Sequence, residues 1–130
     1  MAYKLLVVDD DKDIIETLKP RLIREGYDVV VAYDGKEALR KLKKDNPDIL
    51  LLDLMMPKLN GFEVLKEVRE KHKDKWRPVI IISAHGELET VEKCYDMEAD
   101  HYLKKPCSID TILHGIKTMI SLIPLRKKQE

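Results

Sequence analysis

Cysteine and large aromatic residues are scarce in this chain. Its 130 residues include two cysteines, one tryptophan and one phenylalanine, and aromatic residues make up 5% of the total. Cys94 and Cys107 are too few for a disulfide framework and lack the spacing of metal ligands, so a disulfide-rich or zinc-stabilised domain is excluded. We interpret both cysteines as apolar fillers in a protein of the reducing cytoplasm.

An excess of one charge and a long apolar run are also missing. The 24 lysines and arginines balance 24 acids, so overall charge indicates no polyanionic partner, and no DNA-reading helix is recognisable. No apolar segment reaches the length of a membrane span and no signal-peptide pattern opens the chain, so we expect no membrane association. Residues 104–130 hold six of the bases and two of the acids, which we interpret as a solvated basic tail.

What the chain does contain is a regular alternation of strand-like and helix-like segments. Hydrophobic residues make up 44% and charged residues 37%, which suits one soluble domain. Apolar runs predict strands at residues 4–8, 27–32, 48–52, 79–83 and 100–103. Helical spacing predicts helices at residues 12–25, 36–44, 61–72, 87–97 and 109–123. The alternation predicts an α/β fold with a doubly wound, five-stranded parallel sheet.

The end of the last predicted helix sets the expected domain boundary. Pro124 is expected to stop this helix, because proline cannot continue one, and residues 125–130 are expected to fray. We therefore assign one domain to residues 1–123 and a C-terminal tail, or the start of a linker, to residues 124–130.

Polar residues follow four of the predicted strands. Right-handed crossovers place the carboxyl ends of parallel strands on one edge of the sheet, where such folds bind ligands. The residues that meet at this edge are Asp9, Asp10, Asp53, Ser83, Lys104 and Lys105. Adjacent carboxylates repel one another unless a cation or proton neutralises them, and Mg²⁺ prefers carboxylate oxygens. The simpler alternative for the run of acids after the first strand is a solvated turn that caps the next helix.

This set of groups can handle a phosphoryl group. Asp53 can attack phosphorus and form a mixed anhydride, while Mg²⁺ held by Asp10 and Asp53 screens the repulsion between carboxylate and phosphate. A lysine and Ser83 can neutralise or hydrogen-bond the equatorial oxygens.

Four segments, taken together and in order, resemble the receiver domain of two-component response regulators. They are Leu6-Val7-Val8-Asp9-Asp10-Asp11, Asp53-Leu54-Met55-Met56-Pro57 with Gly61, Ile82-Ser83-Ala84, and Tyr102-Leu103-Lys104-Lys105-Pro106. The resemblance covers residues 3 to about 123 and implies the flavodoxin-like strand order 2-1-3-4-5.

The resemblance implies a phosphorelay function and its partners. Asp53 would take a phosphoryl group from a phosphohistidine of a sensor histidine kinase or histidine phosphotransfer protein. The domain would catalyse its own phosphorylation and dephosphorylation, with no turnover substrate, and would act on a downstream output domain or protein. Homodimerisation on phosphorylation is left open.

The resemblance also implies roles for individual residues. Mg²⁺, for which Mn²⁺ is expected to substitute, would be held by Asp10, Asp53 and the backbone carbonyl of Met55, and by Asp9 through water. Lys105 rather than Lys104 would meet the phosphate, because it directly precedes Pro106 in a bond expected to be cis. Ser83 would swing toward the phosphoryl oxygens and Tyr102 would turn inward behind it. Met55 and His85 flank the route of an attacking water and would tune the lifetime of the phosphorylated form.

Three positions depart from the family pattern. Glu98 stands where a glycine is usual and is expected to lengthen the preceding helix. Cys107 stands where phenylalanine is frequent, and a smaller side chain is expected to loosen packing beneath the site. Pro20 lies inside the first helix, on a surface where many kinases dock, and is expected to kink it.

Three other interpretations remain open. The chain could be the receiver half of a larger regulator whose output domain is absent. Asp9 and Asp11 also resemble the opening of haloacid-dehalogenase-type phosphohydrolases, with Asp9 as nucleophile, although Asp13 and the missing late acidic pair do not fit. A flavodoxin-like cofactor binder would need a phosphate-cradling loop after the first strand.

Overall fold

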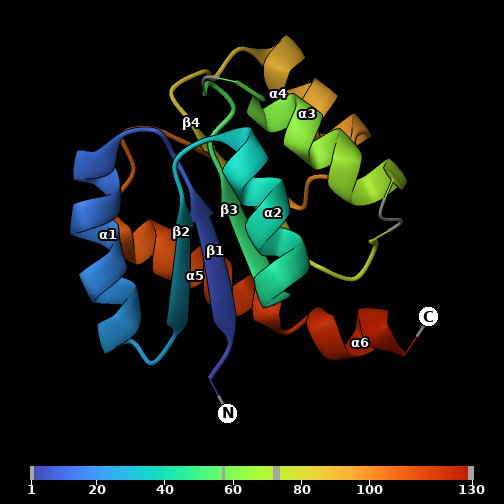
Figure 1. The fold of residues 1–130 in the computed structure, drawn as a ribbon. Helices are drawn as coiled ribbons and strands as arrows, with labels where there is room; N and C mark the ends of the chain where they lie inside the picture. Colours follow the sequence, from blue (N-terminus) through green and yellow to red (C-terminus); the bar gives the residue numbers. More distant parts are fainter. Residues whose placement is uncertain (1, 57, 72–73, 129–130) are drawn as a thin grey trace.

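Five parallel strands form the sheet in the computed structural model, which describes residues 2–56, 58–71 and 74–128 (Figure 1). The strands are β1 (Lys4–Val8), β2 (Asp28–Ala32), β3 (Ile49–Leu52), β4 (Val79–Ser83) and β5 (His101–Lys104). Their order is β2-β1-β3-β4-β5, and every neighbouring pair is parallel. This confirms the predicted doubly wound sheet and its strand order.

Helices cover both faces of this sheet. They are α1 (Lys12–Arg24), α2 (Gly35–Asp45), α3 (Gly61–Lys66), α4 (Leu88–Asp96), α5 (Ile109–Ile120) and α6 (Ile123–Lys127), and α3 continues as the π-helical turn η1 (Glu67–Lys71). Helix α1 runs through Pro20 without interruption. The predicted helix end at His72 and the loop residue Pro57 lie outside the described residues.

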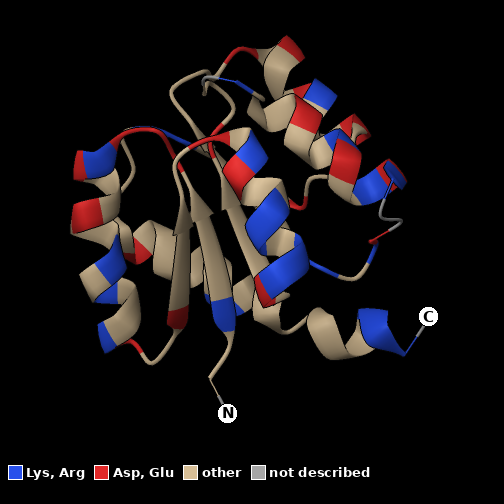
Figure 2. Cartoon of the chain, in the orientation of Figure 1, with Lys and Arg blue, Asp and Glu red and all other residues tan. Residues whose placement is uncertain are grey.

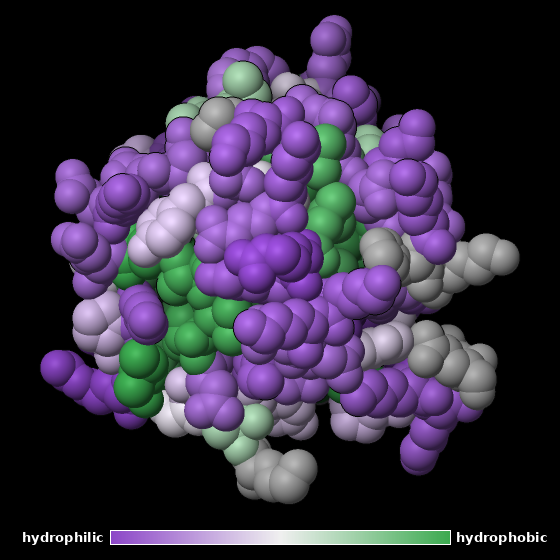
Figure 3. Space-filling model, viewed as in Figure 1, coloured by the Kyte–Doolittle hydropathy of each residue, from purple (hydrophilic) through white to green (hydrophobic). Residues whose placement is uncertain are grey.

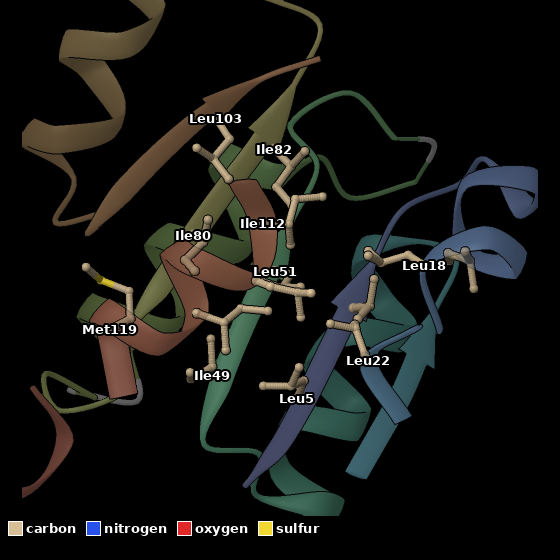
Figure 4. Packing of buried hydrophobic residues seen from close by; sticks show 14 of the residues in the cluster. Leu5, Leu18, Leu22, Ile49, Leu51, Ile80, Ile82, Leu103, Ile112 and Met119 are labelled. Carbon is tan, nitrogen blue, oxygen red and sulfur yellow. The ribbon is translucent and has the colours of Figure 1, made fainter. Parts of the chain in front are cut away.

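The strands bury both of their faces, because successive side chains point to opposite sides. Leu5 and Val7 belong to a core between the sheet and helices α1 and α5, whereas Leu6 and Val8 belong to a second core under α2, α3 and α4. Figure 4 shows the first core, with Leu22 of α1 on one side and Met119 of α5 on the other. Each fully buried aliphatic side chain contributes roughly 1.5–3 kcal/mol, so the two cores hold the sheet rigid.

Most of the helices begin at the carboxyl edge of the sheet with a capping side chain. The carboxylate of Asp11 accepts hydrogen bonds from the backbone N–H groups of Asp13 (3.0 Å) and Ile14 (3.4 Å) at the start of α1. Asp34 caps α2, Asn60 caps α3 in a capping box, and Ser108 caps α5. Three consecutive acids follow β1, and the simpler alternative for them was a turn that caps the next helix. This alternative holds for Asp11.

The C-terminal segment differs from the prediction. Helix α5 ends at Ile120, and a separate helix α6 begins at Ile123, with Pro124 in its first turn, where a missing N–H costs no helical hydrogen bond. Ile123 is buried, and Arg126 forms an ion pair with Asp100. Three predictions for residues 124–128 are therefore wrong. Pro124 does not stop the last helix, the segment is not frayed, and it is not a purely solvated basic tail. The prediction from Pro124 failed because proline is unfavourable inside a helix but favourable in the first turn of one.

The end of α4 also differs from the prediction. The helix ends at Asp96, and Glu98 has a φ of +68°, in the left-handed region that favours glycine. Glu98 therefore ends the helix in the conformation of the missing glycine and does not lengthen it. Its backbone carbonyl accepts a hydrogen bond from Arg69 Nε at 3.1 Å, which ties this turn to η1.

The surface is mainly polar in the view of Figure 3, with apolar side chains visible between α1 and α2, where the edge strand β2 lies. Val29 and Val30 of β2 are half-buried there. In the part of the chain that the structure describes, no helix is long and apolar enough to cross a bilayer.

Candidate functional site

Three carboxylates converge at the carboxyl edge of the sheet. Asp9 and Asp10 follow β1, and Asp53 follows the neighbouring strand β3. One oxygen from each carboxylate lies within 4.8 Å of the others. Asp9 and Asp53 are buried, with 5% and 7% of their surfaces exposed, while Asp10 faces solvent. Figure 2 shows the acidic segments gathered at this edge, as the strand order predicted.

The backbone fixes these carboxylates in place. The N–H of Asp9 donates to the carbonyl of Ala32 at 3.1 Å, and the N–H of Asp53 donates to the carbonyl of Val8 at 3.0 Å, so the strand ladders extend one residue into the site. Gly61 lets the start of α3 pack against the Asp53 backbone, because a Cβ at Gly61 would lie 2.4 Å from the carbonyl oxygen of Asp53. The acids are thus carried by rigid elements.

Lys105 reaches the same pocket from the loop after β5. Its Nζ lies 2.7 Å from Asp9 Oδ2 and 3.5 Å from Asp53 Oδ2. The backbone N–H of Lys105 donates to the carbonyl of Ser83 at 2.7 Å, and the Lys105-Pro106 bond is cis, as predicted. Lys104, in contrast, is exposed, and its side chain lies over Gly86. The structure therefore brings Lys105 rather than Lys104 to the carboxylates.

Burial and crowding shift the ionisation of this cluster. The pKa of Asp53 is raised, first by burial and then by the charge of Asp9, and Lys105 only partly counters this. Burial by itself lowers the pKa of Lys105, but its contacts with Asp9 and Asp53 outweigh burial, so that its pKa is raised. One ammonium thus contacts two of the three carboxylates, and the pocket keeps an excess of negative charge that suits a divalent cation.

The hydrogen bonds of the three acids differ. Asp9 Oδ1 accepts from the backbone N–H of Asp11 at 2.9 Å, and its Oδ2 accepts from Lys105. Asp53 Oδ1 accepts a long bond, 3.5 Å, from the N–H of Met55. Both oxygens of Asp9 therefore have short contacts, whereas the contacts of the Asp53 oxygens are longer, at 3.5 Å to the Met55 N–H and 3.5 Å to Lys105 Nζ.

The predicted switch residues meet around the loop between β4 and α4. Ser83 is fully buried, and its Oγ accepts a hydrogen bond from the backbone N–H of His85 at 3.2 Å. The Tyr102 hydroxyl donates to the backbone carbonyl of His85, and burial raises the pKa of this phenol. The imidazole Nδ1 of His85 lies 3.7 Å from a carboxylate oxygen of Glu87. Ser83 and Tyr102 therefore hold one loop residue from two sides.

Met55 lies at the rim of the site. Its side chain is 57% exposed, and its N–H points toward Asp53, as described above. This position fits a residue beside the route of water, but the ligand role of its carbonyl stays a prediction.

A groove beside Lys105 was not predicted from the sequence. It has a volume of about 420 Å³ and is mostly apolar, and its lining residues are Ile14, Ile82, Ala84, Lys105, Pro106, Cys107 and Ile112. Cys107 is half-buried here, whereas Cys94 is fully buried in the second core. The small residue at position 107, where the family often has phenylalanine, was expected to loosen packing beneath the site, and Cys107 is one of the residues that line this groove.

A model of the family described as "Response regulator receiver domain" matches residues 5–117. Response regulator RR06 of Streptococcus pneumoniae is 41% identical over 116 residues, which are 89% of this chain and 52% of that protein. Response regulator MprA of Mycobacterium ulcerans is 37% identical over 120 residues, which are 92% of this chain and 51% of that protein. The chain spans about half the length of these curated relatives.

Solved structures agree with this assignment. The chemotaxis protein CheY4 of Vibrio cholerae superposes with a TM-score of 0.85 at 31% identity, covering 92% of this chain and 99% of that one. A CheY-like receiver domain from Methanospirillum hungatei gives a TM-score of 0.88 at 26% identity, covering the whole of both chains. The resemblance stated from sequence motifs is confirmed, and the chain belongs to the response regulator receiver domains of two-component signalling.

Proposed function

We propose that Asp53 accepts a phosphoryl group from a phosphohistidine of a sensor histidine kinase or a histidine phosphotransfer protein. The observation that carries this proposal is the convergence of Asp53, its two acidic neighbours and Lys105 in one pocket. In the transfer, a carboxylate oxygen of Asp53 forms the new bond to phosphorus while the bond from phosphorus to the imidazole nitrogen breaks. The phosphohydrolase and flavodoxin alternatives are dropped, because the family match covers residues 5–117.

Mg²⁺ is the cofactor that we propose for this step, with Mn²⁺ as a substitute. Asp10 and Asp53 would hold it directly and Asp9 through water, since the contacts of the Asp9 oxygens, at 2.9 and 2.7 Å, are shorter than those of the Asp53 oxygens, at 3.5 Å. The carbonyl of Met55 would complete the protein ligands. When bound, the ion would neutralise the attacking carboxylate and the incoming phosphoryl oxygens.

Lys105 and Ser83 would bind the phosphoryl group once it is attached to Asp53. Lys105 would move from its contact with Asp9 toward the new oxygens, because a phosphoryl group carries close to two negative charges and attracts the ammonium more strongly than the single charge of Asp9 does. Ser83 would swing toward the phosphoryl oxygens, give up the bond that it accepts from the His85 N–H, and donate its hydroxyl hydrogen to one of these oxygens. Tyr102 would turn inward behind it and release the carbonyl of His85. Moving a two-state equilibrium from about 1:99 to 99:1 needs roughly 5.5 kcal/mol, which a few charge-assisted bonds supply.

The partner would dock at the mostly apolar groove described beside Lys105. This groove joins α1 to the loop before α5, and it opens next to the pocket of Asp53. A downstream output domain or protein would respond to the β4–α4 loop. The matched segments cover 52% and 51% of these two relatives, which fits the receiver half of a larger regulator.

Intact-mass measurement tests the proposal directly. The chain is incubated with a small phosphodonor and Mg²⁺, and we expect the mass to rise by one phosphoryl group. Asp53→Ala should abolish the gain, whereas Asp13→Asn, which removes an exposed acid in the first turn of α1, should keep it. No gain, several gains, or a gain that survives Asp53→Ala would overturn the assignment of Asp53.

A further inference from the structure

Helix α6 lies at the amino edge of the sheet, opposite the edge that carries Asp53 (Figure 1). It begins with Ile123, which is 4% exposed and belongs to the core between the sheet, α1 and α5. Leu125, in contrast, is 60% exposed. The helix therefore uses one apolar residue as an anchor and turns its next large apolar residue away from the body.

Asp100 connects α6 to three other parts of the fold. Its Oδ2 accepts from Arg69 Nη2 of η1 at 3.0 Å and from the backbone N–H of Val79, the first residue of β4, at 2.8 Å. Its Oδ1 accepts from Arg126 of α6. The carboxylate is 10% exposed and lies directly before β5, so α6 is joined to the inner strand β4 and the edge strand β5 and not only to a surface loop.

Trp76 provides a second contact for the same helix. Lys127 Nζ lies 4.2 Å from the centroid of the indole ring, and the guanidinium of Arg77 lies 4.5 Å from it. The indole is half-buried and packs against the core that also holds Ile123. The two neighbouring basic residues of α6 thus each have a partner in the rest of the fold: Arg126 pairs with a carboxylate, and Lys127 lies over an aromatic ring.

The contacts of Arg126 and Lys127 stabilise α6 only weakly, because positive charges already lie on the surface against which α6 packs. Arg69 shares Asp100 with Arg126. Burial lowers the pKa of Arg69, Asp100 counters this effect, and the charge of Arg126 adds to the lowering, because the two guanidiniums repel each other. Arg77 is likewise paired, with Asp74. Arg126 and Lys127 therefore add positive charge to a surface whose own ion pairs are already balanced, and salt weakens such partly exposed contacts.

We propose that Trp76 and Asp100 form a docking surface for a basic helical segment, and that α6 of the same chain occupies it reversibly. The folded unit then reaches Lys127 rather than ending at residue 123. Any segment joined after α6 starts at the edge opposite Asp53 while α6 is docked, and gains freedom when it is released. This inference does not depend on phosphoryl transfer.

The test uses the full chain and its single tryptophan. Arg126→Gln removes the bond to Asp100, and Lys127→Gln removes the cation over Trp76. Lys128→Gln is the matched control, because it removes the same charge from an exposed residue that has no ion pair among the described residues. Accessibility of Trp76 is measured by acrylamide quenching, and opening of α6 by hydrogen exchange of its backbone amides, with a thermal melt to show that each variant folds.

We expect Arg126→Gln and Lys127→Gln each to speed exchange of the α6 amides on the order of fivefold and to expose Trp76, while Lys128→Gln changes neither. High salt should also speed exchange of the α6 amides and expose Trp76 in the parent chain. Equal behaviour of the three variants would overturn the proposal. Protection that grows with protein concentration would overturn it too, since a second copy would then be the occupant.

Discussion

Lys105 and Asp9 are 96 positions apart in the sequence, yet Nζ of Lys105 lies 2.7 Å from Oδ2 of Asp9. This is the shortest ion pair of the candidate site, and it engages the lysine with the acid that we do not expect to be phosphorylated. The ammonium is thus held beside Asp53 without being bound mainly to it. Because the lysine needs to move only slightly, it can follow charge that builds up on a phosphoryl group.

Replacing Lys105 by methionine should raise the pKa of Asp53 further. The lysine is the main group that counters burial and the charge of Asp9 at this carboxyl, so its removal leaves the repulsion unscreened. The measurement is a carboxyl-carbon NMR titration without divalent metal. Lys104→Met, which removes an exposed ammonium, should leave the titration of Asp53 unchanged. An identical titration in Lys105→Met and the parent chain would contradict this electrostatic picture.

Asp53→Asn should stabilise the metal-free protein at neutral pH, with a change on the order of 1 kcal/mol, the usual size of a single-substitution effect. The pKa of Asp53 is raised in the folded state, so its ionised form is less favourable there than in the unfolded chain. As the pH falls through the folded pKa, the native state binds the proton first and the penalty disappears. In urea unfolding, the variant should therefore have the higher free energy of unfolding at pH values above the pKa of Asp53 in the folded state. This difference should vanish at pH values below the pKa of Asp53 in the unfolded chain. An advantage that does not depend on pH would point to a cause other than charge.

Mg²⁺ should stabilise the parent chain against unfolding. At a free concentration ten times the dissociation constant, binding to the folded state alone adds about 1.4 kcal/mol. Asp10→Asn should remove most of this gain, since Asp10 is the exposed member of the carboxylate cluster and has the freest oxygens for an ion. Thermal melts with Mg²⁺ and with a chelator make the comparison, and an equal gain in both proteins would exclude Asp10 as a ligand.

Glu98→Gly should stabilise the fold by roughly 0.5–1 kcal/mol, which corresponds to a rise of a few degrees in Tm. Glu98 has a φ of +68°, and glycine adopts this conformation without the steric cost that a Cβ brings. The side chain forms an ion pair with Lys75, but both groups are about half exposed, so its loss costs little. Lys75→Gln serves as the control for that ion pair. A lower Tm in Glu98→Gly would show that the ion pair outweighs the backbone conformation.

His85→Ala should change the rate at which phosphorylated protein loses its phosphoryl group. The His85 backbone is held by Ser83 and Tyr102, whereas its side chain is 44% exposed and lies close to Glu87. The ring is therefore free to influence an attacking water without holding the loop. Decay is followed by intact mass after the phosphodonor is removed, and a rate equal to that of the parent chain would end this idea.

The sequence predicted the architecture because its signals are local. Apolar runs such as Leu5–Val8 and Ile49–Leu52 are long enough to be buried on both faces, and the observed strands begin and end within one residue of the predicted bounds. The candidate site was equally predictable, because in a parallel sheet the residue after each strand must lie at one edge. The strand order, which places β4 alone between β3 and β5 and so brings Asp53 and Lys105 together, came from the family resemblance and not from local signals.

Predictions from local signals failed at positions where the conformation of a residue depends on partners that are distant in the sequence. Pro124 indicates a helix stop when the sequence is considered alone, but it begins α6, because Ile123 finds a place in the core and Arg126 finds Asp100. Glutamate itself does not indicate a left-handed turn at position 98, and the glycine that is usual there in the family was the one signal for it; the hydrogen bond from Arg69 helps to hold this turn.

The sequence by itself therefore determined which segments are strands and helices and which acids and lysines end at the carboxyl edge. Only the tertiary structure decided that Lys105 rests on Asp9, that Asp11 caps a helix, and that the basic C-terminal segment packs on Trp76 and Asp100. The physical reason is range: hydrophobic periodicity acts between neighbours along the chain, whereas ion pairs and burial depend on side chains that folding brings together.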